Sequence, residues 1–438
     1  MKRIFYPLIF FSLALTFTAN AQFEINGQLV LRSEFKHGYG KLIPDTASPA
    51  FLIGHRLRLS AGYKSKNLHF YSSFQDVRTW GSTAQLNVTD GSLSLHEGWA
   101  EINLDSSWSL KLGRQELNYD NFRFLGNVDW ALQGRSHDFA LAKFVRKNHK
   151  LHIGAGYNQA GDFLSGNIYQ VAKQYKTAQM IWYNYKKISF ELSFLFWNNG
   201  KQSVTYDSAG LNIIDHKVLF SQTIGLPVVR TSLWKNNVTS GFVYYQMGKE
   251  VTDKAISAYD ISLQTTQTLA LNSETQKTIK FTLGAEILSG TKSGSTTGKI
   301  NAFSPLYGTN HIHNGYMDYF FVSGRYENSY GLNDIFLKIR FDNKWGFVSM
   351  DIHNFSANAE ISNSSGQIQK SMLGNEIDIT GGWLINDVVS LQLGYSQMLP
   401  SSTLKYLQSS KASPLQNWAY AMLIIRPKSD KRFIGVLN

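Results

Sequence analysis

The sequence predicts an all-β fold, a transmembrane antiparallel β-barrel of about 18 strands with short periplasmic turns and long extracellular loops. Short polar turns recur roughly every 40 residues, and the segments between them alternate apolar and polar side chains. This alternation is typical of strands with one face toward lipid and the other toward a wet lumen. Eight such turns, with both chain ends on the turn side, give 2 × 8 + 2 = 18 strands.

The predicted turns are rich in Lys, Asn, Asp and Ser. Trp108, Trp234 and Trp345 each lie beside one of them, where an aromatic girdle at the membrane–water boundary is expected. The turns fall at residues 64–67, 105–107, 146–148, 186–187, 235–237, 272–277, 342–344 and 386–387. Between successive turns the chain has room to run out, form a longer loop and return.

Residues 1–21 have the pattern of an export signal. Lys2 and Arg3 precede an apolar run over 8–17, and a small-residue cleavage pattern ends at Ala21. The run is shorter than the roughly 20 residues that span a bilayer as a helix. We expect cleavage after Ala21 and a single transmembrane barrel domain over residues 22–438, located in the cell outer membrane.

Composition narrows the class of partner. The chain has no cysteine, so a lipoprotein anchor and a disulfide scaffold are excluded. Its formal charge is +12, or 12 − 2 = +10 without Lys2 and Arg3, which favours an anionic partner. Nucleic acid is not expected, because the chain is exported and has no basic tail. We expect contacts with outer-membrane lipid, with an anionic or sugar-like solute, and with barrel-assembly and chaperone machinery during biogenesis.

The strands carry charges on one face only. In 28–36, Leu29 and Leu31 oppose Arg32 and Glu34, and in 279–287 the apolar residues oppose Lys280. Alternation fails around 75–78 and 114–116, which indicates bulges or the membrane rim. The charged residues on the predicted lumen faces of the early and late strands are Arg32, Glu34, Arg56, Arg58, Lys338, Arg340, Glu376 and Asp378.

The densest run of unusual residues spans 110–138. A strand ends near Arg114, a loop with alternating Asp and Arg follows, and a returning strand begins near Gly134. The arginines can bind carboxylates in a bidentate manner, either on a ligand or on the loop itself as an internal ion-pair lattice. With nearby polar residues, the predicted solute path from this part of the chain comprises Arg78, Glu97, Arg114, Gln115, Asp120, Arg123, Asp129, Arg135 and Asp138.

These motifs resemble the alginate-export family of outer-membrane barrels from Gram-negative bacteria. The pattern LGRQ…YD…R..G..DW…GR..D carries the resemblance, together with segments 32–35, 56–59, 95–99 and 305–318. The resemblance implies a barrel of about 18 strands and passage of a polyuronate through a pore lined with arginines. It suggests Arg32, Arg56, Arg58, Arg114 and Arg135 for that lining. The chain departs from the family in having only short turns and in continuing past its last strand.

Catalysis is not expected. A Gly-x-Ser-x-Gly nucleophile motif is absent, and no cofactor is implied. His311 and His313 would point the same way on a strand and could bind a metal, but no third ligand is placed by the sequence. We therefore expect a porin-like outer-membrane channel for anionic or polyhydroxylated solutes, such as uronate-type saccharides, with an arginine-lined lumen. The alternative is a cell-surface carbohydrate-binding β protein without transport activity; an outer-membrane hydrolase would need a triad that the sequence lacks.

Overall fold

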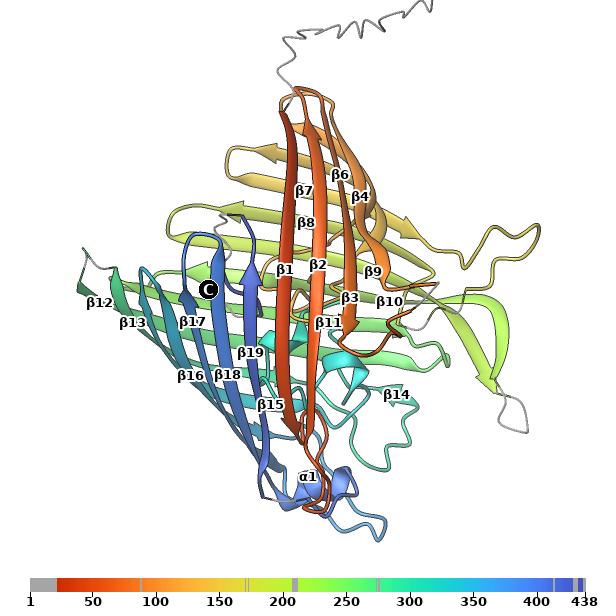
Figure 1. The fold of residues 1–438 in the computed structure, drawn as a ribbon. Coiled ribbons are helices and arrows are strands. Elements are labelled where there is room, and N and C mark those ends of the chain that lie inside the picture. The colour runs from red at the N-terminus through yellow and green to blue at the C-terminus, as the bar shows by residue number, and fades with distance from the viewer. Residues whose placement is uncertain are drawn as a thin grey trace, which may run out of the picture.

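In a computed structural model, the chain forms a closed antiparallel β-barrel (Figure 1). The structure describes residues 22–86, 89–169, 171, 173–206, 212–272, 274, 276–412, 414–427 and 432–435. The predicted export signal, residues 1–21, lies outside the described residues. Nineteen strands are described, and one of them, β14 (Lys299–Ile300), is a two-residue strand within a loop, so 19 − 1 = 18 strands form the wall.

The wall strands follow one another around the barrel in chain order. They are β1 (Gln22–His37), β2 (Ala50–Lys64), β3 (Leu68–Thr79), β4 (Leu93–Asn103), β5 (Trp108–Gln115), β6 (His137–Arg146), β7 (His149–Tyr157), β8 (Thr177–Lys186), β9 (Phe190–Tyr206), β10 (Asn212–Thr231), β11 (Asn237–Lys249), β12 (Ala255–Asn272), β13 (Lys277–Leu288), β15 (Leu332–Asn343), β16 (Gly346–Ser356), β17 (Met372–Leu384), β18 (Val389–Pro400) and β19 (Gln416–Ile425).

Closure comes from β1, which pairs antiparallel with both β2 and β19. All eight predicted turns join neighbouring strands at one end of the barrel, and the longer loops lie at the other end. β1 begins and β19 ends on the turn side, since Gln22 pairs with Lys64 and Ile425 pairs with Val389. The predicted fold class and strand number are therefore confirmed.

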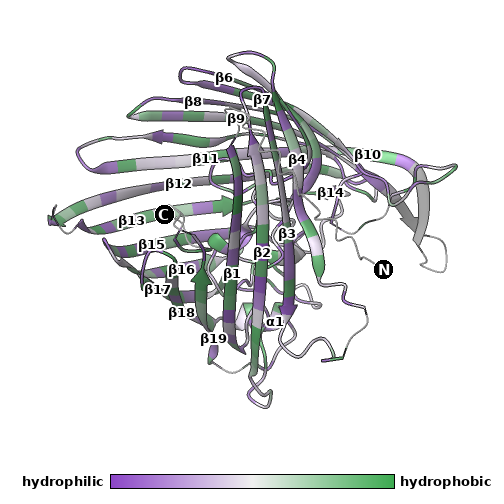
Figure 2. Ribbon diagram, turned by 45° about the horizontal axis from the view of Figure 1, so that its top comes forward, coloured by the Kyte–Doolittle hydropathy of each residue, from purple (hydrophilic) through white to green (hydrophobic). Residues whose placement is uncertain are grey.

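The outer face of the wall is apolar. Leu263, Leu283 and Ile335 are 63%, 58% and 57% exposed, whereas alternate residues on the same strands point inward and are mostly polar. Figure 2 shows this alternation as green and purple bands along the strands. An apolar outer surface of this extent would be unfavourable in water at about 25 cal/mol per Å², but it matches a lipid environment. Closed barrels of this type belong to outer membranes, so the predicted location is confirmed.

Helices are few and short. They are η1 (Asn310–Ile312), η2 (Val322–Gly324) and α1 (Ser402–Leu407). In the part of the chain that the structure describes, no helix is long and apolar enough to cross a membrane.

Two long loops fold into the barrel instead of extending away from it. One covers residues 116–136 between β5 and β6, and the other covers 289–331 between β13 and β15 and contains η1 and η2. Their apolar side chains, including Phe124, Tyr307 and Phe320, form a buried cluster with wall residues such as Trp197 and Trp418. These loops, called here the first and second lumen loops, narrow the barrel from the loop side.

Candidate functional site

Arg123 joins the two lumen loops to the barrel wall. It lies on the first lumen loop with its side chain fully buried, and its Nε is 3.2 Å from Asp260 on β12 and 2.8 Å from Glu286 on β13. Its Nη2 donates to Oδ1 of Asn314 on the second lumen loop at 2.8 Å. A buried cation is tolerated only when it is paired and hydrogen-bonded, as here. Burial alone would lower the pKa of Arg123, but the two carboxylates raise it, so the guanidinium stays charged.

The arginines of the first two strands hold the first lumen loop from the other side of the barrel. Arg56 is fully buried; it contacts Asp129 at 2.9 Å and donates to the carbonyl of Leu132 at 3.2 Å. Arg32 donates to the carbonyl of Trp130 at 2.6 Å and lies over its indole ring. These guanidinium groups face the lumen, but loop atoms cover them.

The second lumen loop is fixed by backbone donors and by carboxylates of β17. Met317 N–H donates to Glu376 at 2.6 Å, and Tyr316 N–H donates to Asp378 at 3.4 Å. Gly315 has φ +81°, and a Cβ at this position would lie 2.5 Å from the Glu376 carboxylate. The close approach of loop and wall therefore requires glycine at 315.

The two lumen loops also bind each other. Thr309 N–H donates to the carbonyl of Phe122 at 2.8 Å, and Gly126 N–H donates to that of Tyr307 at 2.9 Å. Arg135 donates to the carbonyl of Gly308 at 3.0 Å, and burial lowers its pKa to about 10. The loops therefore form one packed unit within the barrel.

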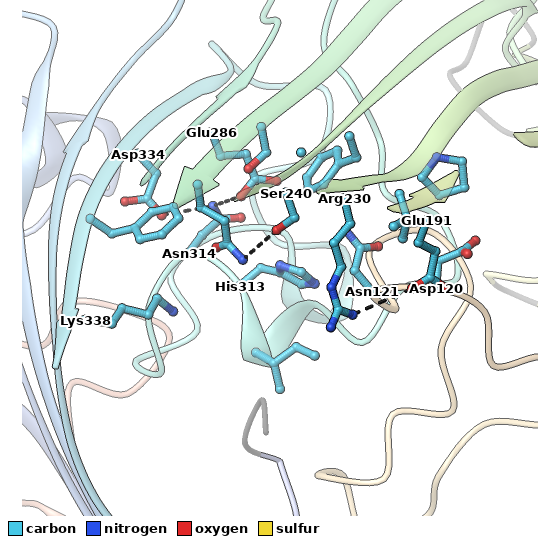
Figure 3. A pocket seen from close by; sticks show the side chains of 18 of the residues that line it. Asp120, Asn121, Glu191, Arg230, Ser240, Glu286, His313, Asn314, Asp334 and Lys338 are labelled. Carbon is cyan, nitrogen blue, oxygen red and sulfur yellow. Dashed lines mark hydrogen bonds and ion pairs between the residues drawn. The ribbon is translucent and has the colours of Figure 1, made fainter. Parts of the chain in front are cut away.

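A cavity of about 430 Å³ lies between this unit and the wall, toward the turn side. Figure 3 shows Glu286 and Asp334 on one side, Arg230 and Glu191 on the other, and the loop residues His313 and Asn314 between them. The polar and charged side chains that line it come from both lumen loops and from β8 to β16: Asp120, Asn121, Lys186, Glu191, Arg230, Ser240, Ser262, Gln264, Glu286, His313, Asn314, Asp334, Lys338 and His353.

Charge is unevenly distributed along this cavity. Near the turns, Lys186 and Arg230 share one carboxylate, Glu191, at 3.1 and 3.6 Å, and both cations are about half exposed. Deeper in the barrel, Asn314 donates to both Glu286 at 2.8 Å and Asp334 at 3.2 Å. The entrance from the turn side therefore carries excess positive charge, and the inner end is rich in acceptors.

Two loop residues in the cavity have shifted pKa values. Burial raises the pKa of Asp120 to about 6, although Ser193 and Trp182 donate to its carboxylate at 2.6 and 2.8 Å. Burial, assisted by the charge of Arg123, lowers the pKa of His313 well below its usual range. His313 is therefore neutral, and among the described residues its Nε2 has no hydrogen-bond partner.

A separate group of three residues has side chains of the kind that bind metal ions. His96, Glu97 and Glu116 bring three ligand atoms within 4.8 Å of one another. Their atoms are already used within the protein: Glu116 contacts Nε2 of His96 at 2.9 Å and accepts from Asn127 at 2.8 Å. Arg58 also lies 3.9 Å from Glu116. The group fits a charged hydrogen-bond network that supports the first lumen loop.

Most of the residues predicted for the solute path lie inside the barrel, but few reach the main cavity. Asp120 and Lys338 line it. Glu97 and Gln115 line a separate turn-side cavity of about 290 Å³. The others on the lumen face of the wall or on the first lumen loop make internal contacts: Arg32, Glu34, Arg56, Arg58, Arg123, Asp129, Arg135, Arg340, Glu376 and Asp378.

Three predicted path residues lie on the outer face instead. Arg114 contacts Asp138 at 3.0 Å across β5 and β6, and Arg78 pairs with Asp90 at 2.7 Å. Their neighbours in the chain, such as Gln115, point into the barrel, so strand alternation turns Arg114, Asp138 and Arg78 outward. Alternation continues to the strand ends, and the ion pairs lie at the loop-side rim.

The histidine pair also differs from the prediction. Residues 310–312 form a turn of 3-10 helix, not a strand, so His311 and His313 face different surroundings. His311 contacts Asp318 at 2.7 Å and stacks on Trp130 with ring centroids 4.2 Å apart. Only His313 reaches the cavity.

Sequence reasoning missed several cavity residues. Glu191, Arg230, Asp334 and Asn314 line the cavity but are not among the predicted path residues, although alternation within residues 188–196 favours a lumen position for Glu191. Glu286 shares the polar face of residues 279–287 with Lys280, but no local signal indicates that it meets Arg123.

The comparisons with known proteins agree with this architecture. No family model matches the sequence, and no curated protein matches it. Among solved structures, the outer membrane protein OpdK of Pseudomonas aeruginosa aligns with 92% of this chain and 98% of its own, with a TM-score of 0.55 and 12% identity. OpdQ of the same organism gives 0.56 and 11% identity, covering 92% of this chain and 97% of its own. OccK9 (OpdG) gives 0.57 and 10%, covering 92% and 98%.

The chain is an 18-strand barrel of the outer-membrane type. At this level of identity the likeness concerns the fold, and it extends over nearly the whole length of both chains. It does not distinguish the alginate-export family, which the motifs of 110–138 resemble, from other barrels of this size.

Proposed function

We propose that this protein is an outer-membrane channel for small anionic or polyhydroxylated solutes, such as uronate-type saccharides. The observation that supports this most directly is the main cavity. It lies inside a closed barrel, is bounded by two interlocked loops, and has charged groups of both signs along its length. This arrangement suits selective passage rather than catalysis.

The cavity offers complementary groups at its two ends. A solute carboxylate would be attracted by Lys186 and Arg230 at the turn-side entrance. Solute hydroxyls would donate to Glu286 and Asp334 and bond to the unpartnered Nε2 of neutral His313. Because charges of both signs are interleaved, each contact would be weak enough for release, as conduction requires.

This proposal gives the predicted lining arginines a different role from the one expected from the sequence. Arg32 and Arg56 would act indirectly, by holding the first lumen loop, and the accessible cations would be Lys186 and Arg230. We also propose a distant relationship to the alginate-export family. It is supported by the motif residues Arg123, Asp129 and Arg135, whose internal contacts shape the lumen loop.

Planar-bilayer recording with purified protein tests the proposal. We expect single-channel steps, and we expect a uronate added on the turn side to reduce the ion current more than a neutral sugar of the same size. A protein that binds sugars but forms no channel in bilayers, and does not permit liposome swelling, would instead be the cell-surface carbohydrate-binding alternative.

A further inference from the structure

The chain does not end with its last wall strand. β19 ends at Ile425 on the turn side, yet residues 432–435 lie inside the barrel. Ile434 is 3% exposed. This burial would not be expected if the residues after β19 extended into solvent. We call residues 432–435 the tail segment.

The tail segment binds the lumen face of β18. Ser390 donates to the carbonyl of Arg432 at 2.8 Å. Two residues further along both segments, Gln392 donates to the carbonyl of Ile434 at 2.9 Å and accepts from its N–H at 3.1 Å. The tail segment therefore runs inward from the turn side, parallel to β18, and the fully buried Gln392 side chain satisfies both the N–H and the carbonyl of Ile434.

Residues of the barrel wall and of the first lumen loop pack against the tail segment. Phe433 packs edge-on against Phe347 of β16, with ring centroids 5.0 Å apart. A Cβ on Gly382 of β17 would lie 2.5 Å from the Phe433 ring, so glycine leaves the space that this ring fills. A Cβ on Gly435 would lie 2.3 Å from Trp130, so the segment reaches the first lumen loop.

The tail segment and the main cavity occupy different sides of the lumen. The segment lies against β16, β17 and β18, whereas the cavity is lined by residues of β8 to β16. We propose that the tail segment is a built-in plug, which closes the lumen beside β16–β18 from the turn side and confines solutes to the main cavity. This rests on the proposed channel function.

Among the described residues, few contacts hold the plug. Its described anchors are three hydrogen bonds to Ser390 and Gln392, the Phe433 ring and one buried aliphatic side chain, Ile434. Ile434→Asp would place a charge in the buried position and expel the segment. The matched control is Ile368→Asp, the same substitution at a residue that is 64% exposed in the loop between β16 and β17.

Conductance in planar bilayers tests the plug, after heat-modifiable gel mobility has shown that each variant is assembled. We expect an upward shift in single-channel conductance for Ile434→Asp and an unchanged value for Ile368→Asp. An assembled Ile434→Asp barrel with unchanged conductance would overturn the plug.

Thiol labelling gives a second readout that does not depend on channel activity or on the charged variant. The chain has no cysteine, so Ile434→Cys and Ile368→Cys each carry a single thiol. We expect a bulky maleimide to modify Cys-substituted position 368 quickly and position 434 slowly. Equal rates would overturn the placement of the plug, whereas slow labelling at 434 in a barrel without conductance would count against the channel function alone.

Discussion

The Nε atom of Arg123 lies 2.8 Å from Oε1 of Glu286, and the two side chains are 0% and 4% exposed. Arg123 belongs to a loop and Glu286 to the wall, so this contact fixes the position of the loop inside the barrel. The same guanidinium group contacts Asp260 and Asn314, and no other described ion pair joins both lumen loops to the wall in this way.

Removing this cation should destabilise the lumen more than the wall. Arg123→Ala leaves Glu286 and Asp260 buried without their counter-charge, and the loss of one partner of a buried pair costs about 3–5 kcal/mol. We expect a lower denaturation midpoint in urea and noisier single-channel currents. Arg114→Gln is the control, because its ion pair is exposed and worth about 0–1 kcal/mol. Equal effects of the two substitutions would contradict the role of Arg123.

Ion selectivity should depend on Lys186 and Arg230 at the turn-side entrance and not on Arg56 of the second strand. An ion 4 Å from a charge in water gains about 1 kcal/mol, which is a factor of about 5 in concentration. We expect Lys186→Gln with Arg230→Gln to lower the anion/cation permeability ratio, measured by reversal potential at low salt. Arg56→Gln should mainly raise conductance by releasing the loop. The preference should fade near 1 M salt, where the Debye length is about 3 Å.

Protonation of Asp120 at acidic pH should stabilise the folded position of the first lumen loop. Its pKa is raised from 3.8 to about 6 because burial penalises the ionised form. The folded state therefore binds more protons than the unfolded state between these values, and stability falls as pH rises from about 4 to 6. We expect a loss of about 1–2 kcal/mol over this window, since part of the side chain meets solvent. Asp120→Asn should remove this component of the pH dependence; an unchanged slope would contradict it.

A charged residue on the outer face of the wall should destabilise the barrel. Leu283 on β13 is 58% exposed and points away from the lumen, so Leu283→Arg should cost about 2–4 kcal/mol near the bilayer midplane. Lys280→Gln on the lumen face of the same strand should fold normally, apart from its ion pair with Asp342. The two variants are compared by the fraction that shows heat-modifiable mobility. Similar fractions would contradict the assignment of the two faces.

Sidedness is tested on intact cells. If the turns face the periplasm, a protease site inserted after Ser365, at the exposed tip of the loop between β16 and β17, should be cut from outside. A site inserted at Lys147, in the turn between β6 and β7, should be spared until the outer membrane is opened. The reverse pattern would place the turns at the cell surface.

The wall could be predicted from the sequence because its determinants are local. Polar turns and period-2 alternation recur within each hairpin, and they placed Arg56, Lys338 and Glu376 on the correct face. Applied to the loop-side ends of β5 and β6, the same alternation also turns Arg114 and Asp138 outward.

The site was less predictable because its contacts are not local. Nothing near Arg123 in the sequence indicates that Asp260 and Glu286 will surround it. The route of a loop through a lumen depends on contacts between distant segments. The charges of the loop pair mainly with the wall, Arg123 with Asp260 and Glu286 and Asp129 with Arg56, and not with one another as an internal lattice would require.

The position of these partners along the chain sets an order for assembly. The loop that carries Arg123 follows β5, whereas its carboxylates belong to β12 and β13 and its amide partner Asn314 comes later still. The loop cannot be locked until those strands have been incorporated, since contacts between distant segments form late. The interior of the barrel can therefore be closed by this contact only in a chain that already holds both β5 and β13. We expect a chain halted before this stage to leave the lumen open to ions.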